Sequence, residues 1–291
     1  MKKTLFFFIH LCILLVFLLL SNRGNSQDAH YFLNKNFIKV LNKDTTYVAL
    51  RNKITQEYIH SNPGSWGEFV KDVDEDIKTT DKIIAFTFDA CGKEKGTGFD
   101  KELIDYLKRE SIPATLFITG RWIDDHFDTF KELASEKLFE IENHGLNHQP
   151  CSIDGESEYG IHGTATVGDA FDEIEANVRK IAAITGHKPH FYRSATAFID
   201  EACAKMARKL NVQAISFQVL SGDAVPFTPI NEIEDNVLKN VKPGAIVIMH
   251  MNHPQWNTFE ALERLVPKLR AEGYRFVQIK DFPLYSVKGQ E

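Results

Sequence analysis

The chain has no excess of positive charge, few cysteines, and no second long apolar run. Its 34 lysines and arginines are outnumbered by 40 aspartates and glutamates, which gives a formal net charge of −6. A chain with this charge balance is a poor binder of phosphate backbones, so we expect no nucleic-acid partner. Only 4 residues are cysteine. One segment alone is apolar enough to enter a membrane, and it lies at the N-terminus.

That N-terminal segment has the three zones of a signal peptide. Lys2 and Lys3 precede an apolar run over residues 5–20, and small and polar residues follow up to Ser26. We expect removal of residues 1–26, export to the periplasm or the extracellular space, and no stable membrane span after cleavage. An uncleaved N-terminal anchor is the alternative, although the run is slightly short for a tilted spanning helix.

Short β-rich runs alternate with helical patterns over most of the remaining chain. Hydrophobic residues make up 43% of the sequence, which is enough for a full core. Seven β/α units in about 200 residues favour an α/β fold whose parallel strands form a closed or nearly closed barrel. An open doubly wound sheet is the alternative. Residues 27–80 are interpreted as a short N-terminal extension. The expected strands lie at 82–88, 114–119, 138–142, 190–193, 212–217, 245–249 and 276–279.

Two histidines four residues apart are the strongest chemical signal in the sequence. His144 and His148 follow the apolar strand expected at 138–142, where it runs out into a loop. Neutral imidazole is a common ligand of Zn²⁺, and a metal held by few protein groups keeps a position open for water or substrate. This pattern favours a metal-dependent hydrolase. The alternative is that His144 caps a strand and His148 is a solvated loop residue.

Other reactive side chains follow the other expected strands. In a parallel barrel the loops after the strands share one rim, so residues just past each strand end are expected to gather there. A random placement would not favour histidines, arginine and aspartates at these positions. They are Asp89, His144, His148, Arg193, Asp223 and His250.

Three of these segments resemble the motifs of a known family. Residues 87–90 read Thr-Phe-Asp-Ala, residues 144–148 read His-Gly-Leu-Asn-His, and residues 248–250 read Ile-Met-His. In chain order they resemble the polysaccharide deacetylases, also called the NodB homology family or carbohydrate esterase family four. Residues 89–92, Asp-Ala-Cys-Gly after Phe88, resemble one branch of that family. The resemblance covers about residues 82–283, and the family's fold implies a distorted (β/α)7 barrel over residues 81–285.

The resemblance also implies roles for the gathered residues. The family's enzymes are metal-dependent N- or O-deacetylases, so the expected substrate is an acetylated glycan such as peptidoglycan or a chitin-like polymer. The expected ion is Zn²⁺, with Co²⁺ or Ni²⁺ as alternatives. The family pattern makes Asp89 the catalytic base, His250 the general acid, Arg193 the partner of the base, Asp223 the partner of the acid, and His144 and His148 metal ligands.

The sequence departs from the family pattern at three places. Ala90 stands where the family has a ligand aspartate, and a methyl group has no donor atom. Arg193 is followed by Ser-Ala-Thr without the family's proline, and Asp223 lacks the usual tryptophan nearby. The metal site then consists either of the two histidines plus water, or of the histidines and another oxygen donor, for which Asp89 is the nearest candidate. Glu142 is interpreted as a packing residue or as a group that supports a ligand. These departures keep two alternatives open: a degenerate barrel that binds glycan without turnover, and a hydrolase of a non-sugar amide.

Three cysteines lie beyond the expected signal peptide. Cys91 follows the first barrel strand and Cys151 lies three residues past His148, so both are expected on one rim. We predict that they form a disulfide, as the exported location permits. Cys203, in an expected helix, is interpreted as a small buried residue.

Overall fold

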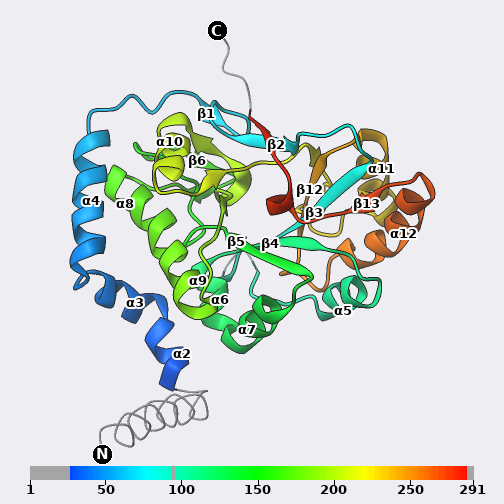
Figure 1. Cartoon of the computed structure of the whole chain (residues 1–291), viewed down its shortest axis with the longest axis horizontal. Coiled ribbons are helices and arrows are strands. Elements are labelled where there is room, and N and C mark those ends of the chain that lie inside the picture. The colour runs from blue at the N-terminus through cyan, green and yellow to red at the C-terminus, as the bar shows by residue number, and fades with distance from the viewer. Residues whose placement is uncertain (1–26, 94–95, 287–291) are drawn as a thin grey trace, which may run out of the picture.

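The structure, a computed structural model, describes residues 27–93 and 96–286 (Figure 1). The predicted signal peptide, residues 1–26, lies outside the described residues. Within the described part of the chain, no helix combines the length and the apolar character needed to cross a membrane.

A curled, mainly parallel sheet lies at the centre of the molecule (Figure 1). Its strands follow the order β10-β8-β5-β4-β3-β12, with β11 beside β12 and β13 beside β3. This arrangement confirms the predicted α/β barrel over the open doubly wound sheet. The strands are β3 (Ile83–Ala90), β4 (Ala114–Ile118), β5 (Phe139–Asn143), β8 (Phe191–Tyr192), β10 (Gln213–Ala214), β11 (Val219–Leu220), β12 (Ala245–His250) and β13 (Arg275–Phe276).

Strand β3 shows why the sheet forms where it does. All eight of its residues are buried, as expected for a parallel strand covered on both faces. Alternate residues face opposite ways. Phe86, Phe88 and Ala90 pack in an apolar cluster with the surrounding helices, whereas Ile83 and Ala85 belong to a second cluster with side chains of other strands. The strand therefore has a helix-facing side and a barrel-facing side.

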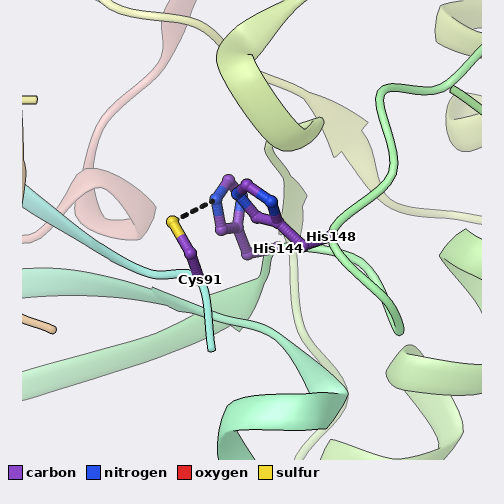
Figure 2. Close-up of side chains that lie close together, drawn as sticks. All are labelled: Cys91, His144 and His148. Atoms are coloured by element: carbon purple, nitrogen blue, oxygen red, sulfur yellow. Dashed lines mark hydrogen bonds between the residues drawn. The ribbon is translucent and has the colours of Figure 1, made fainter. Parts of the chain in front are cut away.

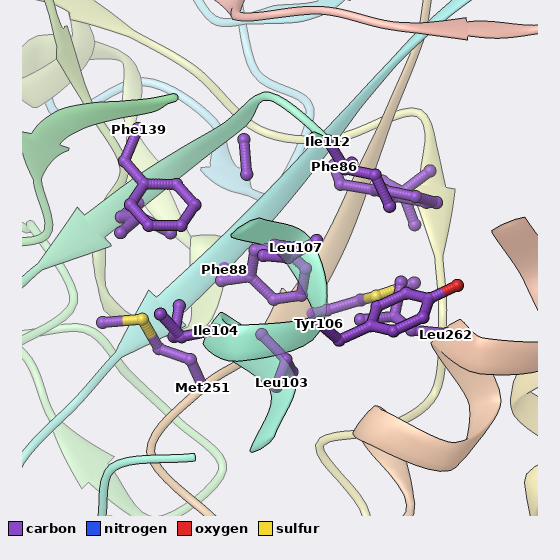
Figure 3. Packing of buried hydrophobic residues seen from close by; sticks show 14 of the residues in the cluster. Phe86, Phe88, Leu103, Ile104, Tyr106, Leu107, Ile112, Phe139, Met251 and Leu262 are labelled. Atoms are coloured by element: carbon purple, nitrogen blue, oxygen red, sulfur yellow. The ribbon is translucent and has the colours of Figure 1, made fainter. Parts of the chain in front are cut away.

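Helices cover the outside of the sheet, and α5 and α12 pack against β3 through the large apolar cluster (Figure 3). Polar side chains cap several helices: Asp100 accepts from the backbone N–H of Leu103 at the start of α5, and Thr119 caps α6. The helices are α5 (Lys101–Arg109), α6 (Gly120–Asp125), α7 (Phe127–Ser135), α8 (Val167–Phe171), α9 (Asn177–Thr185), α10 (Glu201–Lys209), α11 (Ile230–Asn240) and α12 (Thr258–Ala271).

A π-helical turn, η2 (Asp172–Ala176), joins α8 to α9, so residues 167–185 form one continuous helical segment that is not uniformly α-helical. Single π-turns inside α-helices often lie next to functional sites. Glu173, on this turn, is only 2% exposed. The turn therefore places a carboxyl group in the interior, beside the loop that carries the two histidines.

The N-terminal segment packs along one side of the barrel. Its helices are α2 (Gln27–Phe32), α3 (Asn34–Leu41) and α4 (Thr45–Tyr58), and α4 lies beside α8 (Figure 1). Arg51 of α4 holds Asp172 with an Nε–Oδ1 distance of 2.8 Å. Strand β2 (Asp74–Ile77) pairs antiparallel with β12 and with β14 (Leu284–Ser286). The sheet therefore begins before residue 81, and the domain division itself stays a prediction.

Two short two-stranded sheets lie away from the barrel strands. Strand β1 (Trp66–Gly67) pairs antiparallel with β9 (Ile199–Asp200), just before α10. Strands β6 (Ser157–Glu158) and β7 (Ile161–His162) form a hairpin in the loop that follows the histidine pair.

Candidate metal and catalytic site

The strand register brings the predicted site residues to one mouth of the barrel. His250 ends β12 directly opposite Asp89, near the end of β3. Strands β5 and β8 end opposite each other at Asn143 and Tyr192, and His144 follows at once. Because parallel strands end on the same side of a sheet, side chains that are far apart in the sequence meet here.

Asp89 is held by Arg193, as the family pattern implies. Arg193 donates from Nη1 to Asp89 Oδ1 and to Thr87 Oγ1, both at 2.8 Å, and from Nη2 to the carbonyl of Ser216. Its guanidinium lies 4.1 Å from the ring centre of Phe117. Burial alone would raise the pKa of Asp89, but the charge of Arg193 and the nearby histidines outweigh it, and the pKa falls below its ordinary value. Asp89 is thus an ionised carboxylate at neutral pH.

His144 has its tautomer fixed by the backbone. Its Nδ1 lies 2.8 Å from the carbonyl oxygen of Arg193, which can only accept, so Nδ1 carries the proton. The lone pair of neutral His144 is then on Nε2. That atom lies 3.6 Å from Asp89 Oδ2 and 4.0 Å from Cys91 Sγ. A carbonyl behind the ring is the usual way in which proteins orient a metal-ligating imidazole.

His148 is held close to His144 by a strained turn. Its φ is 56°, in the left-handed region, and its side chain is buried with no hydrogen-bond partner at Nδ1 among the described residues. The two ring centres lie 5.1 Å apart. Glu173 supports the turn, because its carboxylate accepts from the backbone N–H groups of Asn147 and Gln149 at 2.9 and 3.0 Å. The chain therefore places a buried imidazole with an open nitrogen beside the first one.

Cys91 completes a cluster of donor atoms with the two histidines. One ligand atom from each of Cys91, His144 and His148 lies within 4.8 Å of the others (Figure 2). Asp89, the oxygen donor predicted to complete the metal site, does not belong to this cluster. The orientation of Cys91 follows from the alternation along β3, which places residue 91 on the same side as Asp89.

The predicted disulfide between Cys91 and Cys151 is wrong. All three cysteines of the described chain are buried and free. Cys91 is turned toward the imidazoles, whereas Cys151 pairs with Ile199 in an isolated β-bridge and contacts Cys203 of α10. Two cysteines on the same rim of the barrel form a disulfide only if their side chains point toward each other, and these two side chains face different neighbours.

His250 and Asp223 form a second charged pair at the same mouth. Asp223 Oδ1 lies 3.0 Å from His250 Nδ1, and Oδ2 accepts from the backbone N–H of His250 at 2.7 Å. Ser221 and Thr258 also donate to the carboxylate. Burial would lower the pKa of His250, but the charge and hydrogen bond of Asp223 outweigh it and hold the pKa well above its ordinary value. The pair therefore offers a protonated imidazole as an acid.

The donor set fits a divalent transition-metal ion. It contains one imidazole with its tautomer fixed, a second with an unpartnered buried nitrogen, and the thiol of Cys91 beside them. Nitrogen and sulfur donors at this spacing suit Zn²⁺ or Co²⁺ better than Mg²⁺ or Ca²⁺. The same mouth holds an ionised carboxylate and a protonated imidazole, the groups that general base and general acid catalysis require.

The structure brings together all the residues predicted for the site, and it adds two that sequence reasoning missed. Cys91 had been assigned to a disulfide, although its spacing from Asp89 places the two on one strand face and could have revealed it. Glu173 had no signal of its own, because a glutamate on a helix is usually solvated and only the π-turn makes it buried. Glu142 is bound by backbone N–H groups of His190 and Phe191, in line with its interpretation as a packing residue.

Comparison with known proteins gives one family. The family model described as polysaccharide deacetylase matches residues 76–215. The chain is 27% identical to a peptidoglycan-N-acetylmuramic acid deacetylase of Bacillus subtilis, over 70% of this chain and 72% of that protein. It is 26% identical to a peptidoglycan-N-acetylglucosamine deacetylase of Bacillus cereus, over 72% of this chain and 92% of that protein.

A solved structure shares the fold. The crystal structure of a CE4 family pseudoenzyme from Bacillus anthracis superposes with a TM-score of 0.58 at 23% identity, covering 69% of this chain and 65% of that one.

Proposed function

Residues 76–215 belong to the polysaccharide deacetylase family, and from this premise we propose that the chain is an exported, metal-dependent deacetylase. Its substrate would be an N-acetylated, or O-acetylated, glycan such as peptidoglycan. Two of its relatives are named as peptidoglycan deacetylases, one for N-acetylmuramic acid and one for N-acetylglucosamine. The apolar segment near the N-terminus, interpreted as a signal peptide, agrees with a substrate outside the cytoplasm.

One observation carries the proposal: an ionised carboxylate and a protonated imidazole lie opposite each other on β3 and β12, at the mouth that also holds the two ligand-type histidines. Asp89 is kept ionised by Arg193, and His250 is kept protonated by Asp223. Two titratable groups whose pKa values are moved in opposite directions are the usual sign of a base and an acid that act together.

Each residue of the site has its own role in the proposed reaction. His144 and His148 would hold a divalent ion, which when bound polarises a carbonyl oxygen and makes water more acidic. Asp89 accepts a proton from the attacking water, whose oxygen forms a bond to the acetyl carbon. The bond from that carbon to the sugar nitrogen then breaks, and the nitrogen takes a proton from Nε2 of His250. Acetate and a free amine are the products, and Asp89 and His250 return to their starting states by exchanging protons with water.

Arg193 and Asp223 act by positioning and by charge. Arg193 holds Asp89 through Oδ1, so that Oδ2 remains free to accept a proton. Asp223 binds Nδ1 of His250 and directs Nε2 toward the mouth. Neither residue needs to touch the acetyl group.

The test is acetate release from N-acetylated glycans by the purified protein loaded with Zn²⁺ or Co²⁺. We expect free acetate and new primary amines from peptidoglycan or from an N-acetylglucosamine oligomer. His250→Ala is the matched control, since it removes the acid and leaves both ligand histidines. Absence of acetate across peptidoglycan, chitin oligomers and acetylated xylan, with metal bound, would exclude the proposal.

A second candidate function is glycan binding without turnover. Ala90 stands at the family's ligand position, and a structural neighbour is described as a pseudoenzyme. Under this alternative the protein retains glycan oligomers in an equilibrium binding assay and releases no acetate. Hydrolysis of a non-sugar amide would use the same groups, and acetate or amine release from a panel of small acetamides distinguishes it.

A further inference from the structure

The family pattern has a carboxylate ligand where this chain has Ala90, and we propose that the thiolate of Cys91 takes that place, so that the metal ion is held by His144, His148 and Cys91. This inference rests on the proposed function for the presence of a metal, and it adds the identity of the third ligand.

The course of strand β3 explains why residue 91 and not residue 90 faces the site. Strand β3 continues to Ala90, which pairs with Ile118 of β4. Ala90 is fully buried and packs in the helix-facing apolar cluster. The next residue on the barrel-facing side after Asp89 is Cys91. In this chain a carboxylate at position 90 would point into apolar packing, whereas a donor at position 91 points toward the imidazoles.

The distances fit an ion bound by both types of donor. With Zn–S near 2.3 Å and Zn–N near 2.0–2.1 Å, a tetrahedral ion holds sulfur and nitrogen about 3.5 Å apart. Cys91 Sγ lies 4.0 Å from His144 Nε2, and the three donor atoms lie within 4.8 Å of one another. The distance between Cys91 Sγ and His144 Nε2 would need to shorten by only a few tenths of an ångström for both atoms to bind one cation.

The surroundings of the three residues support ligation over simple packing. Cys91 and His148 are each 5% exposed and His144 is 1% exposed. His148 Nδ1 has no hydrogen-bond partner among the described residues, and an unpartnered buried polar atom is costly. His144 is already oriented by the Arg193 carbonyl. Since one ligand atom of each residue lies within 4.8 Å of the others, a cation between them would bind both imidazoles and the thiolate together.

The exchange of carboxylate for thiolate keeps one negative charge in the ligand set and changes its softness. A set of two imidazoles and one thiolate favours Zn²⁺ and Co²⁺ and disfavours Mg²⁺, Ca²⁺ and Mn²⁺. It also leaves Asp89 outside the ligand set, with Oδ1 bound to Arg193 and Oδ2 able to serve as the base.

Titration of the metal-free protein with Co²⁺, followed by absorption spectroscopy, tests the inference directly. We expect one equivalent of Co²⁺ to produce a near-ultraviolet sulfur-to-cobalt charge-transfer band in the wild-type protein. Cys91→Ser should lose the band and bind Zn²⁺ at least about tenfold more weakly. Cys91→Asp should lose the band and keep stoichiometric metal. Cys203→Ala, a buried cysteine outside the cluster, is the matched control and should keep the band. Circular dichroism verifies that each variant is folded.

The outcomes separate this inference from the proposed function. Stoichiometric Co²⁺ that depends on His144 and His148 but gives no charge-transfer band in wild type would overturn ligation by Cys91 and leave the deacetylase proposal intact. A charge-transfer band lost in Cys91→Ser, together with no acetate from any glycan, would support the ligand and overturn the enzyme. A folded wild-type protein that takes up no Co²⁺ would overturn both.

Discussion

Two clusters in this molecule are built from the residue types that bind metals, and they differ in how their polar atoms are satisfied. The first is Cys91, His144 and His148 at the carboxyl ends of the strands. The second is Glu140, Glu142 and His190, on β5 and just before β8. Both bring donor atoms within 4.8 Å of one another, so proximity alone does not separate them.

In the second cluster the carboxylates already accept hydrogen bonds from backbone N–H groups. Glu142 Oε2 accepts from the backbone N–H groups of His190 at 2.8 Å and Phe191 at 2.6 Å. Glu140 Oε2 accepts from Ile279 N at 2.9 Å and from Thr115 Oγ1 at 2.7 Å. These bonds tie β5 to the start of its neighbour β8 and to the segment that begins at Ile279. The second cluster therefore holds the barrel together.

The two clusters also differ in whether their ligand atoms are available to a metal ion. Burial raises the pKa of Glu142 to about 8, so at neutral pH the group is mostly protonated and is a poor metal ligand. In the first cluster, His144 has its proton fixed on Nδ1 by a carbonyl, and His148 has an unpartnered nitrogen. Donor atoms that are buried, close together and unsatisfied indicate a ligand site, whereas the same residue types with saturated hydrogen bonds indicate structure.

Replacing the two ligand histidines should have the largest effect. His144→Ala with His148→Ala removes both imidazoles, and the loss of several kcal/mol of charge stabilisation lowers kcat/KM for acetate release by about 10³-fold or more. His190→Ala, from the second cluster, is the matched control and should keep nearly full activity. A double variant that still releases acetate at the wild-type rate would contradict the claim that the first cluster, and not the second, serves the reaction.

Asp223→Asn should change the pH dependence of the reaction as well as its rate. Burial lowers the pKa of His250, and the charge of Asp223 more than reverses this. Without that charge, His250 loses its proton at a lower pH, so the acid is unavailable in the upper part of the active pH range. We expect kcat to fall by about 10²-fold and the basic limb of kcat/KM to move to lower pH. An unchanged basic limb would show that His250 is not the acid.

Changes in the second cluster should act on stability and leave activity nearly unchanged. Glu140→Ala removes the acceptor for Thr115, Ile279 and Lys280, and at about 1 kcal/mol or more for each donor the free energy of unfolding should fall by about 3 kcal/mol. Glu140→Gln keeps an acceptor oxygen and should lose less. Urea denaturation measures the difference. A large loss of acetate release in folded Glu140→Gln would mean that this cluster also serves the reaction.

The smallest effect is expected at Asp100, a third buried carboxylate bound by the backbone. Burial raises its pKa from 3.8 to about 6 in the folded state. Its protonated form therefore favours folding below pH 3.8, and that contribution is lost as the pH rises through about 6. Asp100→Asn keeps the helix cap and removes the titration. We expect it to remove about 1–2 kcal/mol of pH dependence between these values, allowing for solvent screening. Identical stability curves against pH would contradict the assignment.

Much of the barrel could be predicted from the sequence because buried parallel strands leave a strong signal. The run at 82–88 became β3 and the run at 245–249 became β12, with only their ends shifted. The strand predicted at 212–217 was less accurate. Only Gln213–Ala214 pairs as β10, and β11 follows at Val219–Leu220. Irregular strands at a barrel opening are governed by tertiary contacts, which periodicity does not report.

The site residues could be predicted where histidine, arginine or aspartate stands at the end of a strand. They could not be predicted where the direction of a single side chain decides whether it reaches the site. Asp89 and His250 are neighbours because their strands pair in register, which follows from topology. The contacts of Cys91 depend on the direction of its side chain just past the end of β3. The expectation that Cys91 and Cys151 lie on one rim led to the wrong prediction that they form a disulfide. The support of the histidine turn by Glu173 depended on a single π-turn, for which no sequence pattern was available.

The number of zinc ions bound per chain tests the central claim most directly. After loading with excess Zn²⁺ and removal of free ion by gel filtration, elemental analysis should find one equivalent in the wild-type protein and in Glu140→Gln, and none in the His144→Ala, His148→Ala double variant. A folded wild-type protein without zinc would contradict the metal site. Two equivalents, with one lost in Glu140→Gln, would contradict the contrast between the two clusters.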